Sequence, residues 1–500
     1  MKLYKSVLME QDAQHRAASS NTIHRSSLLF AVSPLGNSST VITLSNHFKI
    51  KRGIDSVGMR VWGFDQAGNR LFSDHTLLTE ARVYRYDLTP HGRRYPTLAT
   101  CQVEFYAAAN IGFAYPAVIV NHVGPGFHNV VHSYARVLND VFDDEEVGKF
   151  RVAESSIDVR VDETFDTFVS FLTGPLGLDD EMLEVIVRRP SGESETAHVP
   201  VNRHRFSTTT VRLSETFPGV RFPYGSLVKI KQPVQPMFFG RMIGGCVNRA
   251  DGAFSANHSY YDHSPVAEYV DAPFGYGHYP LIPETRSRLV FYPIQAPSSL
   301  ELSVEYFGER GESLGYGPAR PLDSPGGNAA ILEVSAEGSD AARSYRITAR
   351  PLTGSSLPSR LSHQTVIGHG GLDGSISDSL EYPQGQATDA PPGRPYLSWV
   401  QGVHGARKVT RFGLTAMRAE QRKPTEVLYV VYDERGLVLE KTVIIPPNGA
   451  AFIDSQELFG QPEGADRYFF IYTYCQTSRI KLLGVVHCLD SGHCSAEHNF

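Results

Sequence analysis

The sequence predicts an all-β protein built from four tandem antiparallel β-sandwich modules of about 120 residues each. Two observations predict this fold class. Similar strand-and-turn segments recur four times along the 500 residues, and their glycines are separated by 124, 119 and 125 residues: Gly68, Gly192, Gly311 and Gly436. Glycine, proline and aromatic residues are plentiful, and no long segment has the 3.6-residue periodicity of a helix. We therefore expect sheets joined by short turns, arranged as Ig-like or jelly-roll-like sandwiches.

The repeated segment reads VWGFDQAGNRL in the first copy and YVVYDERGLVL in the fourth. In every copy the glycine follows the opening residue by seven positions. A tight reverse turn between two strands needs a positive φ, which glycine adopts without a steric penalty. Turn geometry therefore explains these glycines, and they need no chemical role.

Changes in composition between the copies predict the domain limits. Proline and glycine are concentrated in residues 271–284 and 383–396, as in interdomain connections, and an acidic stretch lies at 143–148. We expect an N-terminal arm over residues 1–26, followed by modules over residues 27–149, 150–275, 285–385 and 394–500.

Charge and cysteine content exclude several classes of protein. The net charge is −6 without a long run of either sign, which argues against binding to nucleic acid or to a membrane surface. The first 20 residues lack the apolar core of a signal peptide, and no apolar stretch is long enough to span a bilayer. Five cysteines are too few, and odd in number, for a disulfide framework. We expect a soluble, cytoplasmic protein.

The most informative chemical pattern lies at the module ends. Modules one, two and four end in GFHNVVHSYAR, AFSANHSYYDH and GHCSAEHNF, so each presents a histidine followed by serine or asparagine and then an aromatic residue. These histidines, His132, His258 and His498, follow the module glycine by 64, 66 and 62 residues. The third module has no histidine at the corresponding place, near residues 380–382.

If the modules pack around a shared axis, the three imidazoles meet. Three histidines with an open coordination position suit iron, copper or zinc and leave room for a substrate. The pattern thus predicts a metal-binding protein, and suggests a metal-dependent oxidoreductase or hydrolase that acts on a small organic molecule. Tyr260, Asp262 and Glu497 lie beside the histidines in sequence, and we expect them to take part in catalysis or to orient the ligands.

Two alternatives stay open. In the first, the histidines only fill an interface between modules, and the protein is a non-catalytic scaffold that binds a protein or a glycan. In the second, a metal site is local to the last fourteen residues, which contain Cys488, His493 and Cys494 next to His487 and His498. The six-residue spacing of these cysteines differs from the close pairs of structural zinc sites.

Overall fold

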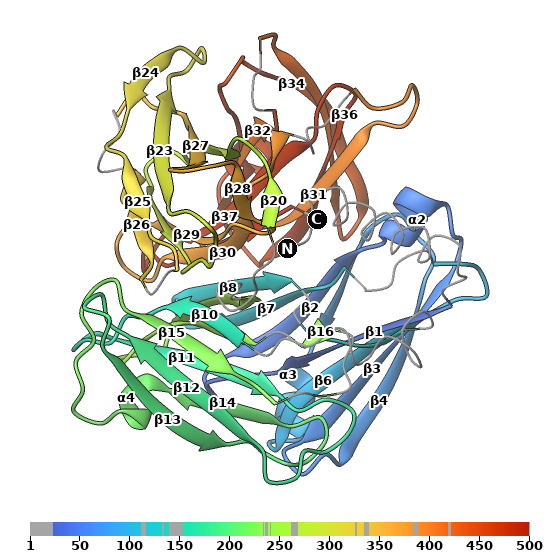
Figure 1. Ribbon diagram of the computed structural model, residues 1–500. Coiled ribbons are helices and arrows are strands. Elements are labelled where there is room, and N and C mark those ends of the chain that lie inside the picture. The colour runs from blue at the N-terminus through green and yellow to red at the C-terminus, as the bar shows by residue number, and fades with distance from the viewer. Residues whose placement is uncertain are drawn as a thin grey trace. The chain divides into compact units, whose positions relative to one another are not determined.

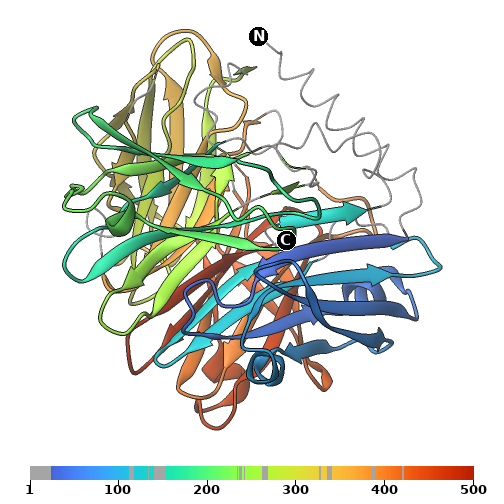
Figure 2. The same ribbon diagram turned by 90° about the horizontal axis from the view of Figure 1, so that it is seen from below.

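The computed structural model describes residues 24–111, 117–132, 135–139, 154–233, 235, 239–240, 242–261, 269–325, 328–334, 340–383, 389–418 and 422–499. They divide into two compact units, the N-terminal unit within residues 8–261 and the C-terminal unit within residues 262–500. Each unit consists of two modules, and each module is a pair of antiparallel sheets (Figures 1 and 2). The predicted class, four tandem β-sandwich modules, is confirmed.

The first module combines a sheet of order β16-β9-β1-β6-β3-β4 with one of order β5-β2-β7-β8. Apolar residues alternate along its strands, so that Val57, Met59 and Val61 are buried on one face. Its elements are β1 (Arg25–Ala31), β2 (Ser39–Ser45), α2 (His47–Arg52), β3 (Val57–Asp65), β4 (Arg70–Leu78), β5 (Val83–Asp87), α3 (Thr89–Arg94), β6 (Leu98–Tyr106), β7 (Ile119–Gly124), β8 (Phe127–His132) and β9 (Ala135–Asn139).

The second module pairs sheets of order β13-β12-β15-β10-β19 and β14-β11-β17-β18, and its short strand β16 joins the edge of the first module's sheet. Its elements are β10 (Glu154–Asp158), β11 (Phe165–Leu172), β12 (Met182–Arg188), β13 (Ser194–Pro200), β14 (Thr208–Arg212), α4 (Leu213–Thr216), β15 (Leu227–Lys231), β16 (Phe239–Gly240), β17 (Ile243–Asn248), β18 (Phe254–His258) and β19 (Tyr260–Tyr261).

The third module pairs a sheet containing β21-β27-β23-β24 with one of order β26-β22-β29-β30, and it has a further two-stranded sheet of β20 and β28. Leucine, valine and aromatic side chains from both sheets form its core. Its elements are β20 (Tyr269–Asp271), β21 (Gly275–Pro280), β22 (Arg286–Phe291), β23 (Leu300–Phe307), β24 (Ser313–Tyr316), β25 (Arg320–Leu322), β26 (Ala330–Leu332), β27 (Ser344–Pro351), β28 (Ser356–Pro358), β29 (Ser362–Gly368) and β30 (Gly374–Ser379).

The fourth module pairs sheets of order β31-β36-β33-β34 and β35-β32-β37-β38. Its elements are β31 (Tyr396–His404), β32 (Lys408–Ala416), β33 (Thr425–Asp433), β34 (Gly436–Ile445), β35 (Ala451–Asp454), α6 (Ser455–Phe459), β36 (Arg467–Cys475), β37 (Ile480–Cys488) and β38 (Cys494–His498). The helices α2, α3, α4 and α6 span only four to six residues. Among the described residues, none of the helices is long and apolar enough to cross a membrane.

The four repeated glycines adopt positive φ, as the turn interpretation predicts: Gly68 (+74°), Gly192 (+91°), Gly311 (+79°) and Gly436 (+121°). In the first module of each unit, the glycine also packs closely against the second module. A Cβ added at Gly68 would lie 2.5 Å from the carbonyl oxygen of Arg205, and one added at Gly311 would overlap the carbonyl oxygen of Pro447. Only glycine fits such close contacts with backbone.

The two loops that Gly68 and Gly311 contact are equivalent. The residues after Arg205 and Pro447, Phe206 and Asn448, both have positive φ, at 55° and 56°, although neither is glycine. Phe206 and Asn448 are 242 residues apart in the sequence. The chain therefore repeats a pair of modules, joined in the same way, in addition to repeating the single module.

The predicted module limits stay predictions. The limit at 149/150 and the limit at 385 fall in residues 140–153 and 384–388, which lie outside the described residues, as does most of the predicted N-terminal arm. All five cysteines are thiols, as their small and odd number predicts.

Candidate metal centre

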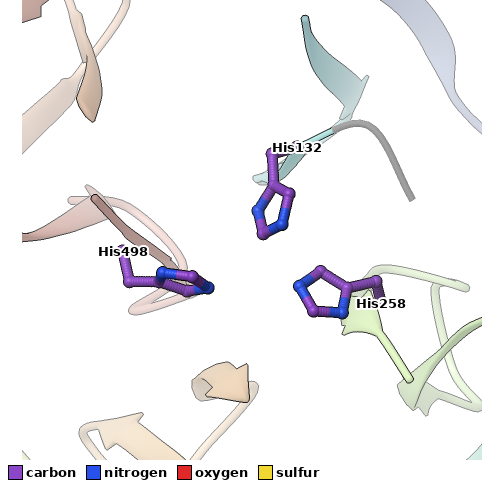
Figure 3. A group of neighbouring side chains, drawn as sticks. All are labelled: His132, His258 and His498. Atoms are coloured by element: carbon purple, nitrogen blue, oxygen red, sulfur yellow. The ribbon is translucent and has the colours of Figure 1, made fainter. Parts of the chain in front are cut away.

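Two of the three predicted ligands lie together in the N-terminal unit. His132 is the last residue of β8 and faces Ile119 across its hairpin, while His258 is the last residue of β18 and faces Ile243. Strands β8 and β18 pack against each other. The two imidazole rings are therefore close, with centroids 4.3 Å apart and planes at 72° (Figure 3).

The backbone defines which nitrogen of His258 is available for a ligand. The Nδ1 atom of His258 lies 2.9 Å from the carbonyl oxygen of Ser259 and donates its hydrogen there. In that tautomer the lone pair is on Nε2, as in many histidines that bind a metal ion. Both His132 and His258 are buried.

His498 has the same local arrangement in the C-terminal unit. It is the last residue of β38, faces Leu483 across its hairpin, and lies 3.1 Å through Nδ1 from the carbonyl oxygen of Asn499. The three histidines are thus equivalent in their hairpins: each lies six residues after a turn glycine with φ near +70°, namely Gly126, Gly252 and Gly492. The ring of His498 is the third one labelled in Figure 3. Because it belongs to the other unit, its part in one centre remains a proposal.

A buried ion pair that the sequence analysis missed lies near His498. Lys481 in β37 donates to the carboxylate of Asp378 in β30, and both side chains are largely buried. Burial alone would raise the pKa of Asp378, but its interaction with the positive charge of Lys481, followed by smaller interactions with His363 and His498, lowers it to about 2. Asp378 belongs to the module without the repeated histidine, so the repeat pattern could not reveal it.

The three candidates for supporting roles have different outcomes. Glu497 is buried, and its Oε1 atom accepts a hydrogen bond of 3.0 Å from the backbone N–H of His498. Asn257 does the same for His258, at 2.7 Å. The side chain of Tyr260 and all of Asp262 lie outside the described residues, and only the backbone of Tyr260 is placed, in β19.

The alternative metal site predicted within the last fourteen residues is assembled only in part. Cys494 approaches His487, with 3.4 Å between Sγ and Nδ1, and the third neighbour is His369 from the preceding module. His493 is buried, and its backbone carbonyl accepts from the N–H of Cys488 in the hairpin turn. Cys494 and His487 are candidates from the sequence, whereas His369 is not, because it is 118 residues from His487.

No protein-family model matches the chain, and no curated protein matches it. One similar solved structure is a tetra-tandem repeat from the extending region of a large adhesion protein, at 11% identity, with 96% of this chain and 98% of that chain covered and a TM-score of 0.10. Another is trypsin-activated alpha-2-macroglobulin from Escherichia coli, at 9% identity, with 95% and 41% covered and a TM-score of 0.15. Scores this low carry no argument about fold or function.

Proposed function

We propose that this protein binds one transition-metal ion, iron, copper or zinc, through His132, His258 and His498, and that the ion acts on a small organic molecule. The observation that carries the proposal is the contact between His132 and His258, two buried imidazoles from different modules. Two imidazoles supply part of a transition-metal site, and a third ligand is needed to resemble the known three-ligand catalytic centres.

The choice of His498 as the third ligand rests on its hairpin. Its Nδ1 atom faces the carbonyl of the next residue, as does that of His258, so both rings present Nε2 as the basic nitrogen. Packing alone would not require the same tautomer at equivalent positions of two units. The arrangement instead matches what a metal ion demands of its histidine ligands.

The neighbouring groups would tune this centre. Glu497 would orient His498 by holding its backbone N–H, a positioning role. Tyr260 and Asp262 follow His258 closely in the sequence, and we propose them as groups next to the substrate. Three protein ligands leave coordination positions for water or substrate, so zinc would support hydrolysis, whereas iron or copper would support oxidation.

Elemental analysis of untagged full-length protein tests the proposal. We expect about one ion per chain at this centre. His258→Ala and His498→Ala should each remove it, because each deletes a ligand. His198 is an exposed histidine on β13, so His198→Ala is the matched control and should retain the ion. All variants are measured in a His369→Ala background, so that an ion held by the His369–His487–Cys494 group does not add to the number of ions per chain.

Two results would contradict the proposal: protein that binds none of the three metals, or full metal content after His258→Ala. Either result would favour the alternative, a non-catalytic β-sandwich scaffold whose loops bind a protein or glycan partner and whose histidines only pack.

A further inference from the structure

The C-terminal unit contains a second group of metal-ligand side chains. His369 lies in the turn between β29 and β30, His487 in β37 and Cys494 in β38. One potential ligand atom from each of these three residues lies within 4.8 Å of the other two. We infer that His369, His487 and Cys494 form a binding site for a zinc or copper(I) ion, separate from the three-histidine centre.

The backbone holds each of these side chains in place. His487 and Cys494 face each other directly across the β37–β38 hairpin. The carboxylate Oδ1 of Asp373 accepts hydrogen bonds from the N–H groups of His369 and Gly370, at 2.9 and 3.0 Å, and so defines the turn that carries His369. The N–H of Cys494 donates to the carbonyl of Leu372 in that same turn, at 2.9 Å. The group is therefore pre-organised.

The spacing matches tetrahedral coordination. The Nε2 atom of His369 lies 3.3 Å from Nδ1 of His487, and Sγ of Cys494 lies 3.4 Å from the same Nδ1. An ion bound at about 2.0–2.1 Å to two nitrogens and about 2.3 Å to a sulfur separates the nitrogens by about 3.3 Å, and nitrogen from sulfur by about 3.5 Å, at tetrahedral angles. These two separations need only small shifts to admit the ion, and the third, between His369 and Cys494, lies within 4.8 Å.

Hydrogen bonding alone does not satisfy these groups. The Nδ1 atom of His487 has either one hydrogen or one lone pair, yet it faces two partners. One hydrogen bond at Nδ1 therefore leaves one of its two neighbours without a bond to this ring, whereas an ion at Nδ1 would bind all three side chains at once.

The N-terminal unit supplies a natural comparison. The cross-strand pair His487–Cys494 corresponds to Val247–Phe254 in the β17–β18 hairpin, where the turn glycine also lies two residues before the second strand. The ring of Phe254 there packs against Phe127, with centroids 5.0 Å apart. The same fold is thus stable with an apolar cluster at this place, and burying polar groups instead points to a role beyond packing.

A catalytic cysteine explains the group less well. Cys494 is fully buried, and burial raises the pKa of its thiol, so it is neither a thiolate nor open to a substrate. Binding of the ion would displace the thiol proton.

The charges around this site and its access to solvent are compatible with binding of a cation. Arg411 lies close enough to disfavour positive charge on His487, but it is ion-paired with Glu284 and Asp454, at 2.8 and 3.2 Å. His369 is exposed, so an ion can enter from its side and keep a fourth position for water or another ligand. One sulfur and two imidazoles favour zinc or copper(I) over magnesium or calcium, which take oxygen ligands.

Cobalt(II) is a suitable probe, because a thiolate bound to it gives a charge-transfer absorption that histidine ligands do not give. We expect reduced, metal-free, full-length protein to show this band on titration with cobalt(II). Cys494→Ala should abolish the band. His369→Ala, at an exposed position, should weaken cobalt binding by more than the roughly 10–100-fold that losing an outer-shell partner costs. His198→Ala is the control for the histidine variant.

The band also separates this site from the three-histidine centre, which contains no sulfur. It should persist in His258→Ala even if the proposed function is wrong. The inference is overturned if the wild-type protein gives no charge-transfer band, if the band survives Cys494→Ala, or if His369→Ala binds cobalt as tightly as the wild type. Should Cys494→Ala fail to fold, the His369→Ala result alone decides the matter.

Discussion

The N-terminal and C-terminal units share one double-sandwich plan but bury different chemistry at the ends of their hairpins. Both have a four-stranded sheet ending in a hairpin in each module, and both dock a turn glycine, Gly68 or Gly311, against the next module. The N-terminal unit packs Val247 against Phe254 and brings two histidines together. The C-terminal unit buries His487 with Cys494, and Lys481 with Asp378.

The difference shows which groups the fold itself requires. Buried polar and charged side chains lose hydration, and an apolar replacement of similar size is often as stable. Since the N-terminal unit folds with Val247 and Phe254 at the corresponding positions, His487 and Cys494 are not there to form the sandwich. They mark a position at which we infer binding.

Breaking the Lys481–Asp378 ion pair of the C-terminal unit should have the largest effect on the free energy of unfolding. Lys481→Met leaves the carboxylate of Asp378 buried without its cation, which should lower the free energy of unfolding by about 3–5 kcal/mol. The chain has two tryptophans, Trp62 in the N-terminal unit and Trp399 in the C-terminal unit. In a Trp62→Phe background, urea denaturation followed by fluorescence therefore reports the C-terminal unit.

The double variant Lys481→Met with Asp378→Leu is the matched control. It removes both charges and should recover most of the lost stability. Equal losses in the single and double variants would mean that packing, and not the unpaired charge, is responsible, and that the two units do not differ in the way described.

Buried neutral histidines are common to both units and should make both acid-sensitive. Burial lowers the pKa of His122 in the N-terminal unit and of His278 in the C-terminal unit to about 4. The unfolded chain takes up a proton below about pH 6.5, where the folded chain does not. Each histidine should thus add nothing to the pH dependence above pH 6.5 and cost about 3 kcal/mol as the pH falls to 4.

His278→Gln is the test in the C-terminal unit, with the Trp399 signal as the readout. Among the charged groups near His278, Arg346 is paired with Glu305, so their fields largely cancel. The variant should lose stability more slowly than the wild type between pH 6.5 and 4. Parallel curves over this range would refute the assignment, and His122→Gln repeats the test in the N-terminal unit.

Substituting two equivalent turn glycines should have the smallest effect on the free energy of unfolding. Gly192→Ala places a side chain at positive φ with no neighbour within 4 Å, so about 1 kcal/mol of backbone strain is expected. Gly311→Ala adds a clash with the carbonyl of Pro447, so it should cost about 2–3 kcal/mol. Urea denaturation of the two variants measures both costs. Equal costs would show that the docking contact is not tight.

The features that the sequence predicts correctly are local and repeated. The repeated strand-and-turn segments and their glycines predicted the four sandwiches, because strand preference and positive φ are imposed by the nearest neighbours in the chain. The equivalence of His132, His258 and His498 followed from their constant distance to those glycines. His369 and Asp378 were missed, since neither belongs to a repeated segment.

By itself, the sequence determined the fold class, the four modules and the matching positions of three histidines. Only the tertiary structure decided that modules are repeated in pairs, that His132 meets His258, and that His369 joins His487 and Cys494. The reason is physical: strand and turn preferences act between close neighbours in the chain, whereas a ligand group depends on how one sheet packs on another, and that contact leaves no fixed spacing in the sequence.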